Sequence, residues 1–106
     1  MNRFSHAVQK VPVPGDYRVQ DDFGAKDHPY AMSADARAIA KRAVDTAEAL
    51  VGERLLYARV DMMWDRADAL VLTELELIEP SLFFRHDSGA PGRLADALAR
   101  WLKAGR

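Results

Sequence analysis

The sequence predicts a small α+β domain in which an antiparallel sheet carries two helices packed on one face. Apolar residues recur at helical spacing over 33–52, and apolar and polar residues alternate on both sides of a polar turn within 55–81. A second helical pattern follows within 82–106. A helix laid across one face of an antiparallel sheet is the simplest way to bury these apolar stripes. A chain of 106 residues has room for one domain with a modest core.

The first region, 1–32, predicts a strand followed by an arginine-bearing loop. Phe4 to Val13 is partly alternating, and the strand is expected to end at the Pro12–Gly15 turn. Two prolines there remove hydrogen-bond donors, and the glycine permits the turn. Residues 16–23 are compatible with a second strand or with an extended loop.

The helix at 33–52 has the clearest boundaries in the chain. Ser33 is a good N-cap, Asp35 is placed where the helix dipole favours a negative charge, and Gly52 can end the helix. One stripe of the predicted helix is apolar, and it consists of Ala36, Ile39, Ala40, Ala43, Val44, Ala47 and Leu50.

The region 55–81, which we call the acidic hairpin, predicts two antiparallel strands. Leu55 to Trp64 alternates, 65–68 is polar enough for a turn, and Ala69 to Leu77 alternates again. A strict alternation puts Leu70, Leu72, Glu74 and Glu76 on one face of the second strand. The last region, 82–106, begins with an apolar anchor and a loop and predicts a helix that turns Leu94, Leu98 and Trp101 inward.

Composition excludes several functional classes. With 15 basic and 16 acidic residues the formal net charge is -1, which gives no electrostatic footprint for nucleic acid or an anionic membrane. The absence of cysteine excludes disulfides, thiolate zinc sites and cysteine nucleophiles. No apolar run has the length of a membrane span or the form of a signal peptide. We therefore expect a cytoplasmic protein with no nucleic-acid or membrane partner.

Three carboxylates of the acidic hairpin, Asp61, Glu74 and Glu76, form a candidate divalent-metal site that we call the acidic cluster. A hairpin folded about 65–69 places Asp61 opposite Glu74, and Glu76 projects beside Glu74. Like charges this close repel, and a hard cation such as Mg²⁺ would remove the repulsion. The alternative is a solvated acidic face, in which Arg59, on the same face as Asp61, serves simply as its ion-pair partner.

The histidines give weaker signals. His6 is either a phosphate or substrate contact or a hydrogen-bonded structural residue, and the structural role is the more common one. His28 and His86 are expected in loops, where they make a poor zinc site.

The ordered set of motifs resembles the C-terminal part of the ATP-grasp superfamily, and it is most similar to glutathione-synthetase-like and other carboxylate–amine ligases. That group includes the ring-closing ligase of cycloserine biosynthesis. The resemblance covers nearly the whole chain, and the helix at 33–52 lies where the family has one. It rests on the segments Phe4-Ser5-His6-Ala7-Val8-Gln9-Lys10, Gly15-Asp16-Tyr17-Arg18-Val19-Gln20-Asp21-Asp22-Phe23-Gly24, Ala58-Arg59-Val60-Asp61-Met62 and Leu72-Thr73-Glu74-Leu75-Glu76-Leu77-Ile78-Glu79-Pro80-Ser81.

This resemblance implies site residues and a chemistry. The acidic cluster is similar to the ligands of the Mg²⁺ (or Mn²⁺) that bridges the ATP phosphates. Arg18 matches a catalytic and cofactor-binding arginine that steadies the transferred phosphoryl group, and Gln20 matches a cofactor-binding position where relatives often have asparagine. Glu76 stands where asparagine is more frequent and adds a negative charge. The implied reaction is activation of a carboxylate by ATP, followed by attack of an amine.

The resemblance covers only the second of the two lobes that form an ATP-grasp site. The sequence has no glycine-rich phosphate loop and no adenine-hinge segment. We therefore expect a fragment, a truncated gene product or one subunit of a split enzyme, inactive alone. Its expected partners are ATP, small carboxylate and amine substrates, and either a separate first lobe or a second copy of the chain. A non-catalytic interaction module and a degenerate relic are the alternatives.

Overall fold

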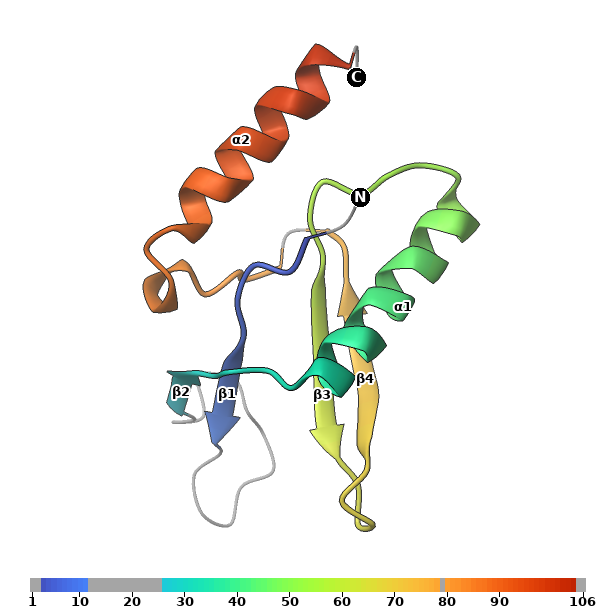
Figure 1. The fold of residues 1–106 in the computed structure, drawn as a ribbon, viewed down its shortest axis with the longest axis vertical. Helices are drawn as coiled ribbons and strands as arrows, with labels where there is room; N and C mark the ends of the chain where they lie inside the picture. Colours follow the sequence, from blue (N-terminus) through green and yellow to red (C-terminus); the bar gives the residue numbers. More distant parts are fainter. Residues whose placement is uncertain (1–2, 12–25, 79, 105–106) are drawn as a thin grey trace.

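The computed structural model describes residues 3–11, 26–78 and 80–104 and has the predicted α+β composition (Figure 1). Arg18 and Gln20 lie outside these residues, as does the expected strand or loop at 16–23. The elements, in chain order, are β1 (Val8–Val11), β2 (Lys26–Pro29), α1 (Ala34–Val51), β3 (Arg59–Trp64), β4 (Leu70–Glu76), the short 3-10 helix η2 (Phe84–His86) and α2 (Ala90–Lys103).

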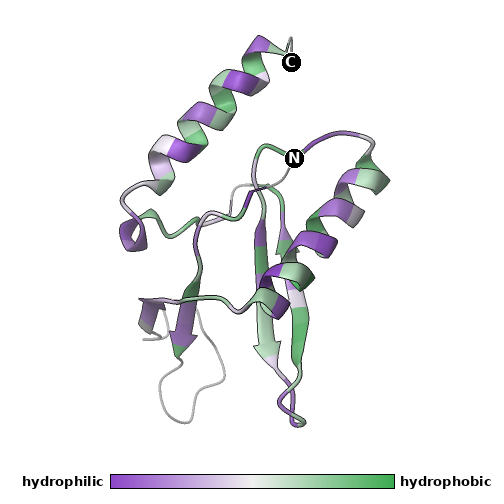
Figure 2. Cartoon of the chain, viewed as in Figure 1, coloured by the Kyte–Doolittle hydropathy of each residue, from purple (hydrophilic) through white to green (hydrophobic). Residues whose placement is uncertain are grey.

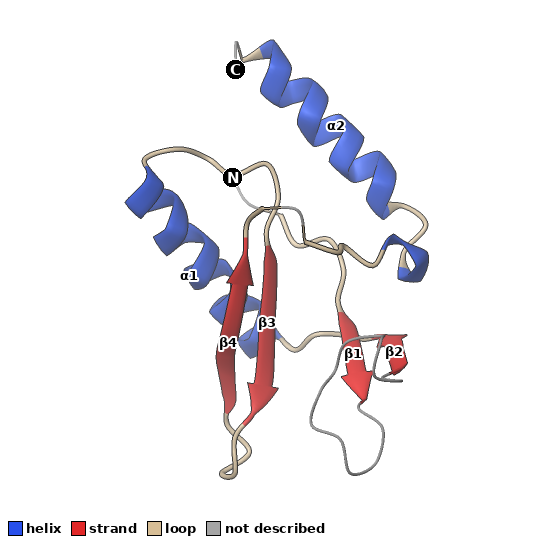
Figure 3. Ribbon diagram, turned by 180° about the vertical axis from the view of Figure 1, so that it is seen from behind, coloured by secondary structure: helices blue, strands red, loops and turns tan. Residues whose placement is uncertain are grey.

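The described strands form two separate antiparallel pairs instead of one sheet. β1 pairs with β2, and β3 pairs with β4; Figure 3 shows the two pairs from behind. β1 begins at Val8, four residues later than expected, and β2 was not predicted. The sequence of β2, Lys-Asp-His-Pro, has neither the alternation nor the β-branched residues that signal a strand.

Local chemistry at both ends of α1 explains its boundaries. The Ser33 hydroxyl accepts a hydrogen bond from the backbone N–H of Ala36 at 3.1 Å, so it caps the N-terminus. Gly52 ends the helix in the left-handed conformation, with φ 83°, and its N–H donates to the carbonyl of Glu48 at 2.8 Å. The helix predicted at 33–52 is confirmed.

The two helices differ in how they pack. α1 lies against β3 and β4, whereas α2 makes no comparable contact with any described strand and extends away from the sheets (Figure 1). Leu94 and Trp101 of α2 are half-buried, but Leu98 and Leu102 are exposed. The expectation that both helices cover one sheet face therefore holds for α1 and not for α2.

The described part of the chain buries very little apolar surface. Its only fully buried apolar residues are two alanines, Ala36 and Ala90, and no large side chain is fully buried. Figure 2 shows hydrophobic residues along both helices and both strands of the hairpin. Large apolar side chains left exposed are Phe4, Val11, Tyr30, Leu50, Val51, Met63, Trp64, Val71, Leu72, Ile78, Leu98 and Leu102.

A β-bulge divides the acidic hairpin into two parts. Arg59 pairs with Glu76 and Asp61 with Glu74, but Met62 pairs with Leu72, so Thr73 is an extra residue on β4. Directly opposed residues share a face, so the bulge puts Leu72 on the face of Met62, while Glu74 stays with Asp61. The strict alternation expected for β4, with its leucines and glutamates on one face, is therefore wrong.

Candidate metal centre

The acidic cluster is assembled by strand pairing across the hairpin. Asp61 comes from β3 and lies opposite Glu74 of β4, and Glu76 follows Glu74 on the same face. One carboxylate oxygen from each of the three residues lies within 4.8 Å of the others. Asp61 and Glu76 are half-buried, and Glu74 is exposed, so the cluster is open to solvent on the Glu74 side. The predicted juxtaposition of these carboxylates is confirmed.

Arg59 provides an internal counter-charge to the cluster. Its Nε donates to Oδ1 of Asp61 and its Nη2 donates to Oδ2, both at 2.9 Å. The same Nη2 lies 3.0 Å from Oε1 of Glu76, the residue paired with Arg59 across the strands. The anticipated pairing of Arg59 with Asp61 is confirmed, and the second contact, to Glu76, adds to it.

The charges of the cluster shift the pKa values of Glu74 and of the neighbouring Arg59. Glu74 has a raised pKa, because it shares a hydrogen bond with Glu76 and lies beside the negative charges of Glu76 and Asp61. Arg59 opposes this shift only in part. Partial burial acts to lower the pKa of Arg59, but the hydrogen bond to Asp61 and the three carboxylate charges outweigh it, so that pKa is raised. Three carboxylates with one guanidinium leave the group with excess negative charge.

The oxygen atoms suit a hard cation after small side-chain movements. Mg²⁺ binds oxygen at about 2.1 Å, so its ligand atoms lie about 3–4 Å apart, and it retains several waters. The present 4.8 Å span is slightly wider than that. Both oxygens of Asp61 are engaged by Arg59, so a cation must compete with the guanidinium for them. The Thr73 hydroxyl donates to the carbonyl of Asp61 at 3.1 Å, so the bulge residue helps to hold the Asp61 backbone in place.

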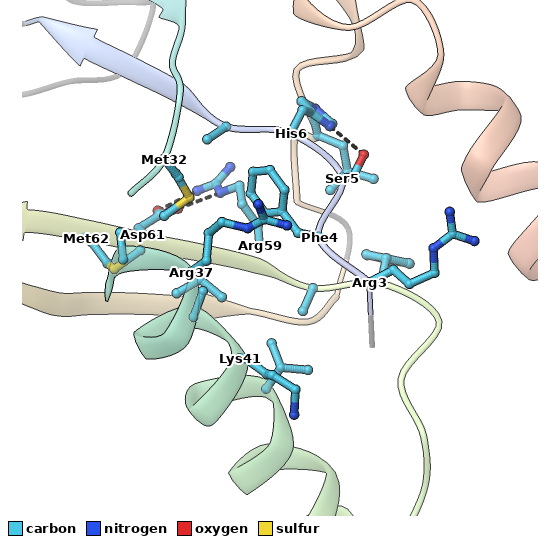
Figure 4. Close-up of a pocket in the computed structure, with 18 of the residues that line it drawn as sticks. Arg3, Phe4, Ser5, His6, Met32, Arg37, Lys41, Arg59, Asp61 and Met62 are labelled. Atoms are coloured by element: carbon cyan, nitrogen blue, oxygen red, sulfur yellow. Dashed lines mark hydrogen bonds and ion pairs between the residues drawn. The ribbon is translucent and has the colours of Figure 1, made fainter. Parts of the chain in front are cut away.

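A wider concavity extends from the acidic cluster to α1 and to the segment before β1. Figure 4 shows Arg59 and Asp61 joined by hydrogen bonds there, with Phe4 and Arg37 nearby. The Arg37 guanidinium lies 4.5 Å from the centroid of the Phe4 ring, and Met32 and Met62 add apolar wall. The concavity therefore combines apolar and cationic side chains beside the acidic cluster.

The other candidate residues named from the sequence are three histidines, Arg18 and Gln20. His6 Nε2 donates to the carbonyl of Leu82 at 2.6 Å, and its Nδ1 lies 2.7 Å from the hydroxyl of Ser5, a pattern that supports the structural role. His28 lies on β2 and His86 on η2, so the expectation that both lie in loops is wrong. Arg18 and Gln20 fall outside the described residues.

Sequence reasoning missed a second charged group, which joins β2 to η2. The Asp27 side chain is 7% exposed; its Oδ1 accepts from Nε2 of His86 at 2.6 Å, and its Oδ2 pairs with Arg85. The hydrogen bond from His86 lowers the pKa of Asp27; burial opposes this, and Arg85 reinforces it. Arg85 and His86 are 58 and 59 residues away from Asp27 in sequence, so no local sequence pattern predicts these contacts.

No family model, no curated protein and no solved structure matches the chain. Within the described ranges, no helix is both long and apolar enough to cross a bilayer. The described residues form an α+β domain that carries an acidic cluster with a built-in arginine counter-charge.

Proposed function

We propose that the chain is the C-terminal, ATP- and metal-binding lobe of an ATP-dependent carboxylate–amine ligase of the ATP-grasp type. The observation that carries the proposal is the cross-strand pairing of Asp61 with Glu74, with Glu76 beside them. These are the three residues that the sequence resemblance matched to metal ligands. Their carboxylate oxygens lie within 4.8 Å of one another, which is compatible with a shared cation.

The residues have separate roles in this proposal. The acidic cluster holds Mg²⁺ or Mn²⁺, which would neutralise the phosphate charge of bound ATP. Arg18 steadies the transferred phosphoryl group, and Gln20 contacts the nucleotide, as the resemblance implies. Arg59 positions the Asp61 carboxylate through its two-point ion pair. Electrostatic stabilisation of the phosphoryl group then supplies most of the catalysis.

The lobe is proposed to act with a first nucleotide-binding lobe and to be inactive alone. An ATP-grasp site lies between two lobes, and this sequence carries no glycine-rich phosphate loop. Exposed side chains such as Trp64 and Leu72 at the hairpin support a partner surface, because apolar area of this kind is usually covered in an assembly. The proposed location is cytoplasmic, and the proposed substrates are a small carboxylate and an amine.

The exposed apolar side chains also favour a second candidate, a non-catalytic interaction module that has kept the fold. In that case Arg59 is a permanent structural partner of Asp61 and Glu76. Sedimentation at several concentrations tests this candidate. Reversible self-association without Mg²⁺ or ATP affinity supports it, and a clean monomer at all concentrations contradicts it.

Calorimetry tests the ligase proposal. Mg²⁺ is titrated into the folded chain with and without ATP, and the Asp61→Asn variant should lose at least tenfold in Mg²⁺ affinity. Asp68→Asn is the matched control, because Asp68 lies in the turn of the same hairpin, outside the cluster, and asparagine tolerates its φ of 59°. A folded chain that binds neither Mg²⁺ nor Mg²⁺-ATP contradicts the proposal.

A further inference from the structure

The apolar side chains of α2 form two rows that differ in exposure. The inner row is buried or half-buried and consists of Ala90, Leu94, Ala97 and Trp101. The outer row is exposed and consists of Pro91, Ala95, Leu98 and Leu102. Successive residues in each row are four, three and four positions apart, which is the spacing of the contact seam in a coiled coil. One row is enough to pack α2 on its own chain, so the outer row can contact a second helix.

The outer row carries no charge. The charged residues of α2 are Arg93, Asp96, Arg100 and Lys103, and at about 3.6 residues per turn all four lie on other sides of the helix. The occupant of the outer row is therefore selected by apolar shape and not by charge. The formal net charge of the chain is only -1, so two copies do not repel each other strongly.

The contacts of α2 with its own chain are limited. Arg93, in the first turn, donates to the Ser5 hydroxyl at 2.8 Å and pairs with Asp87 at 3.0 Å. Beyond that turn the helix extends away from both strand pairs (Figure 1). In the inner row, the indole N–H of Trp101 is buried and has no acceptor among the described residues, which costs about 1–3 kcal/mol. A helix of 14 residues is marginally stable without tertiary packing, so further packing on α2 is expected.

The exposed area of the chain is large enough to supply an interface. The chain exposes 7872 Å², whereas a compact monomer of 11.8 kDa exposes about 5,900 Å². A standard interface buries about 800 Å² on each partner, which is less than half of the difference. No large side chain among the described residues is fully buried, so much of the excess is apolar. Apolar area of this extent is usually covered by a partner.

We propose that the outer row of α2 is the contact face of a homodimer, in which the α2 helices of two copies pack antiparallel about a two-fold axis at Leu98. This arrangement places Leu102 of each copy opposite the partner's Ala95, so that a large side chain meets a small one. It also sets the two helix dipoles antiparallel. A parallel pair would oppose leucine to leucine and alanine to alanine and would leave a gap at Ala95. The row is thus complementary to itself, as a two-fold interface requires, and this favours a second copy over an unrelated chain.

Sedimentation velocity of the intact chain, without added metal, tests for the dimer. The chain should show a reversible monomer–dimer equilibrium that shifts towards the dimer as its concentration rises. Leu98→Glu places two carboxylates at the two-fold axis and should weaken dimerisation at least tenfold. Leu50→Glu is the matched control, because it makes the same substitution near the end of α1, where Leu50 is 83% exposed. If exposed apolar side chains associated without specificity, Leu50→Glu would weaken the dimer at least as much as Leu98→Glu.

Cross-linking tests the antiparallel arrangement. The chain contains no cysteine, so a single introduced thiol reports which residues meet across the interface. Leu98→Cys should form a disulfide-linked dimer on mild oxidation, because a residue at the axis lies beside its own copy. An equimolar mixture of Ala95→Cys and Leu102→Cys chains should form the mixed disulfide in preference to either symmetric one. A parallel pair would instead link each variant to itself.

A monomer at all concentrations overturns the inference, as does a dimer that Leu98→Glu leaves unchanged or that Leu50→Glu weakens equally. Symmetric disulfides in the mixture overturn the antiparallel arrangement. Circular dichroism spectra that match the wild type show that each variant is folded. The inference does not rest on the ligase proposal: the acidic cluster lies on β3 and β4, so Leu98→Glu should bind Mg²⁺ as the wild type does. A chain that dimerises through α2 but never binds Mg²⁺ contradicts the ligase proposal alone.

Discussion

Arg59 and Asp61, two residues apart on β3, form a two-point ion pair in which Nε–Oδ1 and Nη2–Oδ2 are both 2.9 Å. The same guanidinium reaches Glu76 on β4 at 3.0 Å. A bidentate arginine–carboxylate pair has a fixed geometry and is stronger than a single contact. The acidic cluster is therefore partly neutralised by the protein itself, and any cation that binds there competes with Arg59.

Arg59→Gln should destabilise the chain and make its stability depend more strongly on Mg²⁺. Loss of a guanidinium that is only 22% exposed leaves three neighbouring carboxylates without their counter-charge, which costs about 1–3 kcal/mol near neutral pH. Bound Mg²⁺ should restore much of the lost stability, because a ligand that binds only the folded state stabilises that state. Urea unfolding with and without Mg²⁺ measures both effects.

The matched control for this experiment is Arg66→Gln, which removes the same charge from the turn of the hairpin, between β3 and β4. Its stability should change by less than about 0.5 kcal/mol. If Arg59→Gln gains no more from Mg²⁺ than Arg66→Gln does, the guanidinium and the cation do not compete for the same carboxylates.

Mg²⁺ binding should weaken as the pH falls through the raised pKa of Glu74. The folded chain holds a proton on Glu74 more tightly than a free glutamate would, because Glu76 and Asp61 lie beside it. Mg²⁺ must displace that proton, so its affinity is highest above the pKa of Glu74 and is lost below it. Calorimetry at a series of pH values should show that Mg²⁺ binding releases protons, and that this release is lost in the Glu74→Gln variant.

The same raised pKa has a consequence for folding. A carboxyl group whose pKa is higher in the folded state than in the unfolded state favours folding at low pH and opposes it as the pH rises through the folded value. In the absence of Mg²⁺, Glu74→Gln should therefore unfold at a higher urea concentration than the wild type at pH 7. Equal midpoints would show that the repulsion within the cluster is negligible.

Asp27→Asn should separate β2 from η2 and lower stability by about 1–3 kcal/mol at pH 7, since the carboxylate is 7% exposed and bonded to His86 and Arg85. The pKa of Asp27 is lowered from 3.8. This stabilisation is complete above pH values near 3.8 and disappears as the pH falls through the lower folded pKa. In acid unfolding, the wild type should lose stability at low pH as Asp27 is protonated, and the Asp27→Asn variant should lack this loss.

Asp45→Asn is the control for the Asp27 experiment. Asp45 pairs with Lys41 one turn away on α1, at an exposed position. Removing such a pair costs about 0.3–0.5 kcal/mol. Equal losses from the two variants would mean that the Asp27 group is no stronger than a surface ion pair.

Gly52→Ala should lower the free energy of unfolding by about 1 kcal/mol, because Gly52 ends α1 with φ 83°. Nothing lies within 4 Å of an added Cβ there, so the loss comes from the strain of a left-handed alanine and not from a steric clash. Gly92→Ala in α2 provides the contrast, since nothing lies within 4 Å of an added Cβ there and φ is not positive. That variant should be stabilised by about 0.4–1 kcal/mol. Thermal unfolding followed by circular dichroism compares the two, and a loss in both would contradict the conformational argument.

The elements whose signals are local were predictable from sequence. Ser33 and Gly52 mark the ends of α1 by cap chemistry alone, and both caps are present. The pairing of Asp61 with Glu74 followed from the alternation and from the position of the polar turn. Counting two residues further along each strand would also have found Arg59 opposite Glu76.

What sequence reasoning missed depends on long-range or irregular geometry. The bulge at Thr73 cannot be recognised from the alternation of apolar and polar residues in the sequence. It nevertheless determines which face of the β3–β4 pair Leu72 occupies. The joining of Asp27 to His86 spans 59 residues, and β2 lacks a strand pattern. The position of α2 depends on how much apolar surface the chain can cover, which periodicity alone does not give.

Paramagnetic broadening by Mn²⁺ tests whether Asp61, Glu74 and Glu76 hold a divalent cation, as we propose. Substoichiometric Mn²⁺ should first broaden the amide signals around these carboxylates on β3 and β4, and excess Mg²⁺ should reverse the effect. Asp61→Asn should abolish this localised broadening, whereas Asp68→Asn should retain it. Broadening of amide signals near exposed carboxylates throughout the chain, or broadening that is unchanged in Asp61→Asn, would contradict a cation site at these three residues.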